Sequence, residues 1–310
     1  MRHNIMPVGA STKVRHNEVW ANVISASKPF VYRTGKHGSA AMILCFVPKG
    51  GSTMWSFVMA KQLGIDVVNE TSGRIIWAHS HSKLPYVVDS LQWESLLNNA
   101  KTKRYMFVRH PHSRLLSAYL NKVKPGLISV RGYNATTGDF KDFVRALTRV
   151  PLASLDQHIQ LQTLLCGLPQ GVRYQRFLRV EEMGQWYRTI VCALRLEGAV
   201  SGGWRLFNRW TAGINRTREG EQDCFVRTHD CGCKIDCDGA TCNAADGLRG
   251  EGSRHIGLSA SFTGAATALE QHYDLATAEA VNTWAAQDLA MLGYRRWRPG
   301  TPLMHRVGVA

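Results

Sequence analysis

The stretch that most constrains this chain is residues 41–64, AMILCFVPKGGSTMWSFVMAKQLG. Residues 42–47 form a short, unbroken apolar run, which is typical of a strand buried on both faces of a parallel sheet. After that run, Trp55, Met59 and Leu63 recur every four positions, which predicts an amphipathic helix. The stretch therefore predicts a buried strand and a helix that are joined by a tight glycine turn.

The turn between this strand and this helix has the composition of an anion cradle. Its residues are Pro48, Lys49, Gly50, Gly51, Ser52 and Thr53. The two glycines allow a phosphate to approach the backbone, the helix N-terminus favours an anion, and Lys49 adds a full charge. The turn is not the G-x-x-x-x-G-K-[ST] loop of nucleoside-triphosphate-binding proteins, because Lys49 precedes the glycines.

A second unit with the same design begins with an apolar strand at residues 105–108. Pro111 fits the first turn of the helix that follows. Arg109, His110 and Arg114 gather at the start of this helix, where anions are favoured. Ligands of open α/β sheets bind at the carboxyl ends of the strands. Two such junctions therefore predict a ligand with two separate phosphate groups.

The two junctions resemble the donor-binding motifs of the sulfotransferases. PKGGSTMW is similar to their 5′-phosphosulfate loop, and RHPHSRLLSAY is similar to their 3′-phosphate motif, R-x-P-x-x-R-x-x-S-x-Y. The residues that match the second motif are Arg109, Pro111, Arg114, Ser117 and Tyr119. Segments at residues 156–167, 174–183 and 273–294 are similar to later motifs of the Golgi carbohydrate sulfotransferases of the chondroitin, dermatan and HNK-1 type.

The resemblance implies the sulfotransferase fold, a P-loop-like parallel sheet flanked by helices, and the donor 3′-phosphoadenosine 5′-phosphosulfate (PAPS). The glycine turn would cradle the 5′-phosphosulfate, with hydrogen bonds from Ser52 and Thr53. Lys49 would stabilise the charge that builds on the bridging oxygen as the S–O bond breaks. Arg109 and Ser117 would hold the 3′-phosphate. The acceptor would be a hydroxyl of a glycan, expected to be acidic, and the scheme requires no metal.

A general base is also required, because the acceptor hydroxyl must lose its proton, and imidazole has a suitable pKa. His79 and His81 follow a strand expected at residues 74–78, and residues two apart in an extended chain project to the same side. A similar H-x-H serves as the base in the distantly related uronyl 2-O-sulfotransferases, so the resemblance favours His81 or His79. The pattern alone would also suit a metal site, although no third ligand with matching spacing lies nearby. His158 is a third candidate, for catalysis or acceptor binding.

The charge of the chain fits such ligands. Lys and Arg outnumber Asp and Glu by 38 to 23, a formal net charge of +15, and such a field attracts polyanions. Nucleic acid is not expected as a partner, because the basic residues are scattered and no nucleic-acid-binding fingerprint is present. An acidic glycan and a doubly phosphorylated nucleotide fit the charge equally well.

Two other classes of protein share part of this pattern. A P-loop-like kinase would have a related topology, but it should show a Walker A lysine and a Mg²⁺-binding acid, and neither arrangement is present. A non-catalytic polyanion-binding protein would explain the charge but not two matched anion-binding junctions. Sulfuryl transfer to a carbohydrate is therefore the favoured interpretation.

The pattern predicts one sulfotransferase domain at residues 39–298, between a poorly patterned segment at residues 1–38 and a loose tail at residues 299–310. Residues 198–257 are interpreted as an insertion that is rich in Gly, Arg, Asp and Thr. Further helices are expected at residues 86–102, 140–147 and 276–292. His158, Gln162 and Cys166 are spaced four apart, which predicts that they share one helix face.

The insertion holds five of the eight cysteines: Cys224, Cys231, Cys233, Cys237 and Cys242. They would form disulfides in an oxidising lumen, with the fifth joined to Cys166 or Cys192. Zinc is the alternative, although there is no clean pair of C-x-x-C knuckles.

The resemblance implies a location in the Golgi lumen or membrane, because these sulfotransferases usually carry an N-terminal membrane anchor. Sequons at Asn69, Asn134 and Asn215 are compatible with a glycoprotein of the secretory path. The chain contains no apolar run of the ~20 residues that span a bilayer. Either the anchor is missing from this sequence or the protein is soluble, and the sequence leaves both open.

Overall fold

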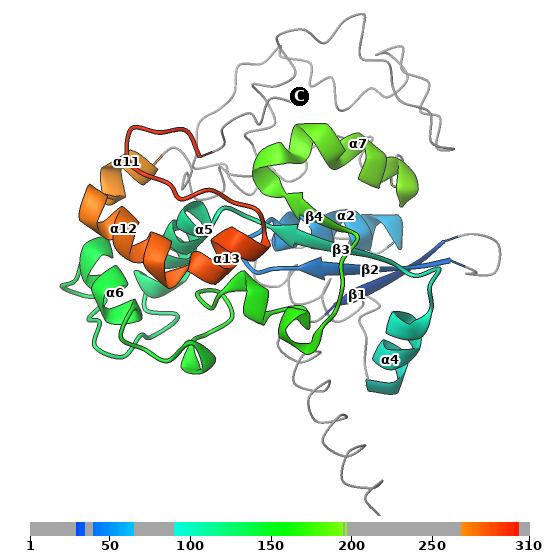
Figure 1. Ribbon diagram of the computed structural model, residues 1–310, viewed down its shortest axis with the longest axis horizontal. Helices are drawn as coiled ribbons and strands as arrows, with labels where there is room; N and C mark the ends of the chain where they lie inside the picture. Colours follow the sequence, from blue (N-terminus) through cyan, green and yellow to red (C-terminus); the bar gives the residue numbers. More distant parts are fainter. Residues whose placement is uncertain (1–28, 35–39, 65–89, 195, 197–267, 304–310) are drawn as a thin grey trace, which may run out of the picture.

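A mostly parallel sheet forms the centre of the protein (Figure 1). The computed structural model describes residues 29–34, 40–64, 90–194, 196 and 268–303. The sheet has four strands in the order β1 (Phe30–Thr34), β2 (Ala40–Phe46), β3 (Lys103–Val108) and β4 (Arg176–Arg179). Strands β2, β3 and β4 run parallel, and β1 pairs antiparallel with β2 at the edge. The predicted α/β fold with parallel strands is confirmed, and the strands predicted at residues 42–47 and 105–108 pair as neighbours. The strand expected at residues 74–78 lies outside the described residues.

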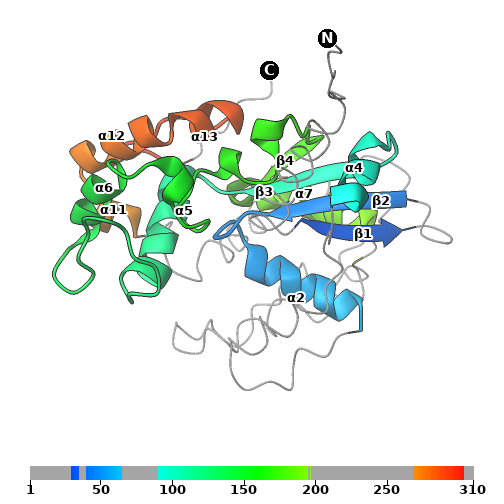
Figure 2. The ribbon, with the colours of Figure 1, turned by 90° about the horizontal axis from the view of Figure 1, so that it is seen from below.

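Helices cover both faces of the sheet. On one face lie α2 (Ser52–Gln62) and α7 (Met183–Ala193), and on the other lies α4 (Ser90–Asn98) (Figure 2). Neighbouring residues of β2 point to opposite faces, as the pleat of a strand requires. Leu44 therefore packs in the cluster that contains Trp55 and Trp186, whereas Ile43 packs with Trp93. Because both faces are covered, β2 is apolar throughout.

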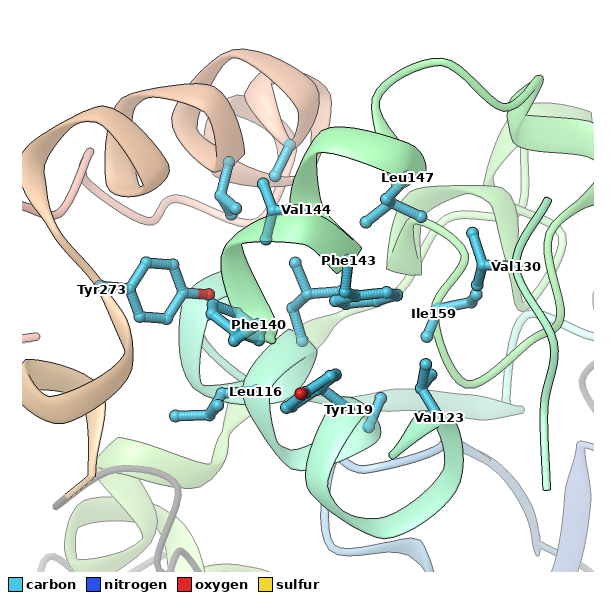
Figure 3. Packing of buried hydrophobic residues seen from close by; sticks show 14 of the residues in the cluster. Leu116, Tyr119, Val123, Val130, Phe140, Phe143, Val144, Leu147, Ile159 and Tyr273 are labelled. Atoms are coloured by element: carbon cyan, nitrogen blue, oxygen red, sulfur yellow. The ribbon is translucent and has the colours of Figure 1, made fainter. Parts of the chain in front are cut away.

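A helical layer stands at the carboxyl ends of β2 and β3 (Figure 1). Its elements are α5 (Pro111–Ala118), the π-helical turn η2 (Tyr119–Val123), α6 (Phe140–Leu147), α11 (Leu269–His272), α12 (Leu275–Trp284) and α13 (Ala286–Met291). Aromatic rings fill the centre of this layer, and Tyr119, Phe140 and Phe143 lie against one another (Figure 3). The layer fixes the helix that follows β3, and the predicted helix at residues 140–147 is confirmed.

The prediction that His158, Gln162 and Cys166 share a helix face is wrong. This part of the chain consists of turns, with the short 3₁₀ helices η3 (Leu152–Ser154), η4 (Gln162–Leu164), η5 (Leu168–Gln170) and, after β4, η6 (Val180–Glu182). The backbone N–H groups of Gln162 and Thr163 donate to the carboxylate of Asp288 instead of to an α-helical carbonyl. Cys166 has φ of 61°, which an α-helix does not admit.

Three other elements differ from the predictions. Residues 30–34, within the segment expected to carry no pattern, form β1, because five residues are too few to show a period but can still pair with β2. The helix expected at residues 86–102 is shorter, since α4 ends at Asn98. The helix expected at residues 276–292 breaks at Ala285, whose ψ of 16° lies outside the helical range.

A buried disulfide ties β2 to the turns that lead toward β4. Cys45 of β2 is bonded to Cys166, 121 residues further along the chain. The expectation that Cys166 pairs with a cysteine of the insertion is therefore wrong. The insertion at residues 198–257, with its five cysteines, lies outside the described residues. Among the described residues, no group of three His, Cys, Asp or Glu is arranged to hold a metal, and no helix is long and apolar enough to cross a membrane.

Replacing both Cys45 and Cys166 with Ala should lower the free energy of unfolding by about 2–4 kcal/mol, because the bond closes a long loop in the unfolded chain. Denaturant unfolding with and without a reducing agent measures the effect. Reductant should destabilise the wild-type protein and leave the double variant much less affected. Recovery of Cys45 and Cys166 as free thiols, by non-reducing peptide mapping of protein matured in an oxidising compartment, would contradict the assignment.

Candidate functional site

The glycine turn at residues 48–53 lies between β2 and α2 and passes close to the end of β3. A Cβ atom on Gly50 would stand 3.0 Å from the carbonyl oxygen of Val47 and 3.2 Å from that of Phe107. Gly51 has φ of +83°, a left-handed conformation that favours glycine. Helix α2 begins at Ser52, so Ser52 and Thr53 belong to its first turn, where backbone N–H groups have no partner within the helix. The turn thus combines two glycines with a helix N-terminus, the features that the sequence analysis expects of an anion cradle.

Both the backbone conformation of Lys49 and the surroundings of its amine are unfavourable for a charged lysine. Its φ of 68° is left-handed, which costs a residue with a side chain about 1–2 kcal/mol. Its Nζ donates to Oδ1 of Asn121 over 2.9 Å. Burial, followed by the positive charges of Arg109, Lys122 and Arg114, lowers the pKa of Lys49 to about 7. Cations gathered around a strained, partly buried lysine favour the binding of an anion at this place.

Arg109, the residue expected to hold the 3′-phosphate, joins the two strand-to-helix junctions. Its Nη1 donates to the carbonyl oxygen of Lys49 over 3.3 Å, and its Nε donates to Oγ of Ser113 over 3.0 Å. The side chain of Gln162 clamps the backbone of Arg109, accepting from its N–H at 2.9 Å and donating to its carbonyl at 2.8 Å. Ser117 stands one helical turn after Ser113 on α5 and is buried with it. Arg109, which is expected to hold the 3′-phosphate, therefore lies beside the turn expected to hold the 5′-phosphosulfate.

Glu181 supplies a counter-charge that the sequence analysis did not single out. Its Oε1 accepts from the backbone N–H of His110 at 2.8 Å and from the hydroxyl of Ser113 at 3.3 Å, and its Oε2 accepts from the Tyr294 hydroxyl at 3.2 Å. Burial lowers the pKa of Arg109, and the charge of Glu181 opposes that shift. The signal available in the sequence was the resemblance of residues 174–183 to a family segment, which contains this glutamate.

Arg114 does not serve as a phosphate ligand, although it stands in the second motif. Its Nε donates to the carbonyl of Pro48 at 2.9 Å, its Nη1 to that of Gln160 at 2.7 Å, and its Nη2 to that of Gln157 at 2.8 Å. The side chain is buried. Arg114 thus binds the glycine turn to the turn at residues 157–160.

The two histidines of the second motif are structural as well. His110 and His112 are fully buried, and their Nε2 atoms lie 3.2 Å and 3.1 Å from the carbonyl oxygens of Arg295 and Ala278. Burial lowers the pKa of His110 to about 4 and that of His112 to about 3, so both rings are neutral at pH 7. His110 stands at the start of the helix, as the sequence shows, but its neutral ring adds no positive charge there.

Of the three candidate bases, only His158 belongs to the described residues. His79 and His81 lie outside the described residues, so their role stays a prediction. His158 is half-buried in a turn, and its ring Nδ1 lies 2.7 Å from Oδ1 of Asp156. Burial lowers the pKa of His158, Asp156 raises it, and Lys122 and Lys49 lower it further. The charge of Lys49 thus reaches His158 and contributes to the lowering of its pKa.

Two strand-to-helix turns at the carboxyl ends of adjacent parallel strands place this protein in the α/β class, whose ligands bind at such strand ends. The model of the Sulfotransferase family matches residues 36–223, more than half of the chain, and this stretch includes both junctions. The chain therefore belongs to the sulfotransferase family that comprises carbohydrate sulfotransferases such as the chondroitin and HNK-1 types. A search of curated proteins and a search of solved structures gave no match.

The reactivity of Lys49 should follow its lowered pKa. In competitive labelling with deuterated acetic anhydride, Lys49 should reach half its maximal rate near pH 7, because the amine reacts only when it is neutral. Lys141 is the matched control, since its ion pair with Asp274 raises its pKa above 10.5. Mass spectrometry of the labelled peptides gives both profiles. A Lys49 rate that still climbs in parallel with that of Lys141 above pH 9 would show that the surrounding cations do not act on it.

Proposed function

We propose that this protein transfers the sulfuryl group of PAPS to a hydroxyl of a carbohydrate acceptor. The observation that carries the proposal is the hydrogen bond from Arg109 to the carbonyl of Lys49, which unites two anion-binding junctions into one site. PAPS has a phosphosulfate at one end and a separate 3′-phosphate at the other, so it needs two such junctions. Membership of the sulfotransferase family supports the same donor.

The residues present fit this donor. Gly50 lets the turn pack closely against the carbonyl oxygens of Val47 and Phe107, so the turn can hold the compact form that a phosphosulfate cradle needs. Pro48, Gly51, Ser52 and Thr53 complete the cradle and the helix N-terminus behind it. Burial and neighbouring cations lower the pKa of Lys49 to about 7, and the negative donor would raise that pKa again and favour the charged form. Donor binding would thereby relieve the repulsion among these cations.

Lys49 would act chiefly in the transition state. As the sulfuryl group leaves, negative charge grows on the oxygen that joined it to the 5′-phosphate. A lysine ammonium held at that oxygen stabilises the transition state more than the ground state, which raises kcat. Arg109 and Ser117 would meanwhile hold the 3′-phosphate and so fix the position of the reacting end.

The acceptor is proposed to be a glycan, acidic in character, reached in the lumen of the secretory path. Both the family and the net charge of +15 support this class of acceptor. The buried bond between Cys45 and Cys166 supports an oxidising compartment such as the Golgi lumen, because disulfides persist there and are rare in the cytosol.

The proposed function is tested by incubating the protein with ³⁵S-labelled PAPS and a panel of chemically desulfated glycans, namely chondroitin, dermatan and heparin. Label should transfer to at least one of them. Lys49→Ala should reduce the turnover by at least about 10²-fold, because a donor to the developing charge is lost. The control is Lys141→Ala, which removes an exposed lysine outside the site. Absence of transfer from wild-type protein to every member of the panel would overturn the carbohydrate acceptor.

Donor binding can be tested without an acceptor. Ser117→Ala should weaken the binding of adenosine 3′,5′-bisphosphate by about 10–100-fold, because a hydrogen bond to a charged group is lost. It should leave adenosine 5′-phosphosulfate, which lacks the 3′-phosphate, nearly unaffected. Arg109→Ala should weaken both ligands, because Arg109 also supports the carbonyl of Lys49. Calorimetry provides the affinities, and equal losses for both ligands in Ser117→Ala would remove Ser117 from the 3′-phosphate site.

A further inference from the structure

We infer that His158, oriented by Asp156 and held beside the glycine turn by Arg114, is the base that removes the proton of the acceptor hydroxyl. The inference rests on the proposed sulfuryl transfer and names the residue that performs its proton-transfer step. It is an alternative to the expectation that this base comes from His79 or His81, which lie outside the described residues.

The first support is the orientation of the ring. Oδ1 of Asp156 accepts from the backbone N–H of His158 at 2.8 Å and lies 2.7 Å from ring Nδ1. A carboxylate can only accept, so Nδ1 carries the proton and the lone pair lies on Nε2. A base whose second nitrogen is held by a carboxylate is fixed in one tautomer, and the carboxylate stabilises the imidazolium that forms. The pair Asp156–His158 therefore has the arrangement that proton abstraction needs.

The second support is the position of the ring. The guanidinium of Arg114 binds the carbonyl of Pro48, the residue before Lys49, and the carbonyl of Gln157, the residue before His158. One rigid, planar group thus spans the two backbones, and it is only 2% exposed. His158 is therefore held close to the turn that would present the sulfuryl group.

The third support is the anchoring of the turn that carries His158. The next residue, Ile159, is buried in the aromatic cluster of the helical layer (Figure 3). A third hydrogen bond from Arg114 fixes the carbonyl of Gln160. A base must be held within hydrogen-bond reach of the proton that it abstracts, and these contacts on both sides of His158 limit its movement.

Burial and the charges around His158 favour its neutral imidazole, which is the form that can accept a proton. Burial lowers its pKa, Asp156 raises it, and Lys122 and Lys49 lower it, with a net shift downward. A pKa below the usual value of about 6.5 means a neutral imidazole at pH 7. Activity that depends on this base is present above the lowered pKa and is lost as the pH falls through it.

The other histidines of the described residues do not fit this role. His110 and His112 are buried with Nε2 directed to main-chain carbonyls. His272 belongs to α11, where its ring packs against Phe140. Within the part of the chain that the structure describes, His158 is the histidine that lies near Lys49 and has Nε2 as an acceptor.

These groups account for the proton, the bonds and the electron pair that move in the transfer step. Nε2 of His158 takes the proton of the acceptor hydroxyl while the acceptor oxygen forms a bond to sulfur. The bond between sulfur and the bridging oxygen breaks, and its electron pair leaves with adenosine 3′,5′-bisphosphate. Lys49 stabilises the charge on that oxygen, and Asp156 stabilises the charge on His158. The proton on His158 then passes to solvent, which reaches its half-buried side chain.

The test compares His158→Ala with wild type on the desulfated glycan that accepts label. The variant should lose about 10²–10⁴-fold in kcat, the usual span for general-base catalysis, and should keep its affinity for adenosine 3′,5′-bisphosphate. Added imidazole should restore part of the lost rate to His158→Ala, which a purely structural defect would not allow. Asp156→Asn should lower kcat by at least about tenfold, because the wrong tautomer is then favoured. His272→Ala is the matched control and should behave like wild type.

The outcomes separate the two proposals. If wild type transfers sulfate and His158→Ala keeps near-normal turnover, the inference is overturned, and His81→Ala and His79→Ala, measured in parallel, locate the base. Loss of bisphosphate binding together with turnover in His158→Ala would also overturn it, because His158 would then support the donor site. If wild type neither binds adenosine 3′,5′-bisphosphate nor transfers sulfate, the proposed function fails, and the inference fails with it.

Discussion

The buried guanidinium of Arg114 is the interaction on which the rest of the site depends. Its three hydrogen bonds join carbonyl groups of two turns that are about a hundred residues apart in the chain. Burial lowers the pKa of Arg114 to about 10, and the carboxylates of Asp288 and Asp156 oppose that shift, so the group stays charged at neutral pH. A lysine could not replace it, because a single ammonium on a flexible stem cannot reach three carbonyls that lie around a plane. The relative position of the glycine turn and the candidate base thus follows from the shape of one side chain.

Buried cations need buried anions, and here the anions come from distant segments. Asp288 of α13 accepts four hydrogen bonds from Gln162 and Thr163, and Gln162 in turn clamps the backbone of Arg109. Glu181, which follows β4, fixes the start of α5. The C-terminal helices therefore support the anion-binding residues although they stand outside the two junctions. A buried carboxylate left without its donors would be costly, so these networks hold the site in one arrangement.

The sequence predicts the parts of this protein whose pattern is local. The strands before both junctions, the glycine turn and the helix at residues 140–147 could all be found, because apolar runs, glycines and helical spacing act over a few residues. The sequence could not show that Arg114 binds carbonyl groups or that His110 is buried, since both facts depend on what the fold brings around them. The turns at residues 156–166 have helical spacing in the sequence, but their N–H groups bind Asp288, which is more than a hundred residues away. The bond between Cys45 and Cys166 could not be predicted either, because the two cysteines are 121 residues apart in the chain.

The arrangement around Lys49 explains how one site can bind an anion and also favour the transfer of its charge. Lys49 has a left-handed backbone, a largely buried amine and three cations around it, so its charged form is unfavourable. A phosphosulfate would supply the opposite charge and make protonation favourable again. The gain would be greatest when the leaving oxygen carries its full charge, because the interaction between two charges in a poorly solvated site grows with each of them. The electrostatic cost of bringing these cations together would in this way be relieved most completely in the transition state, which is the condition for raising kcat instead of merely tightening binding.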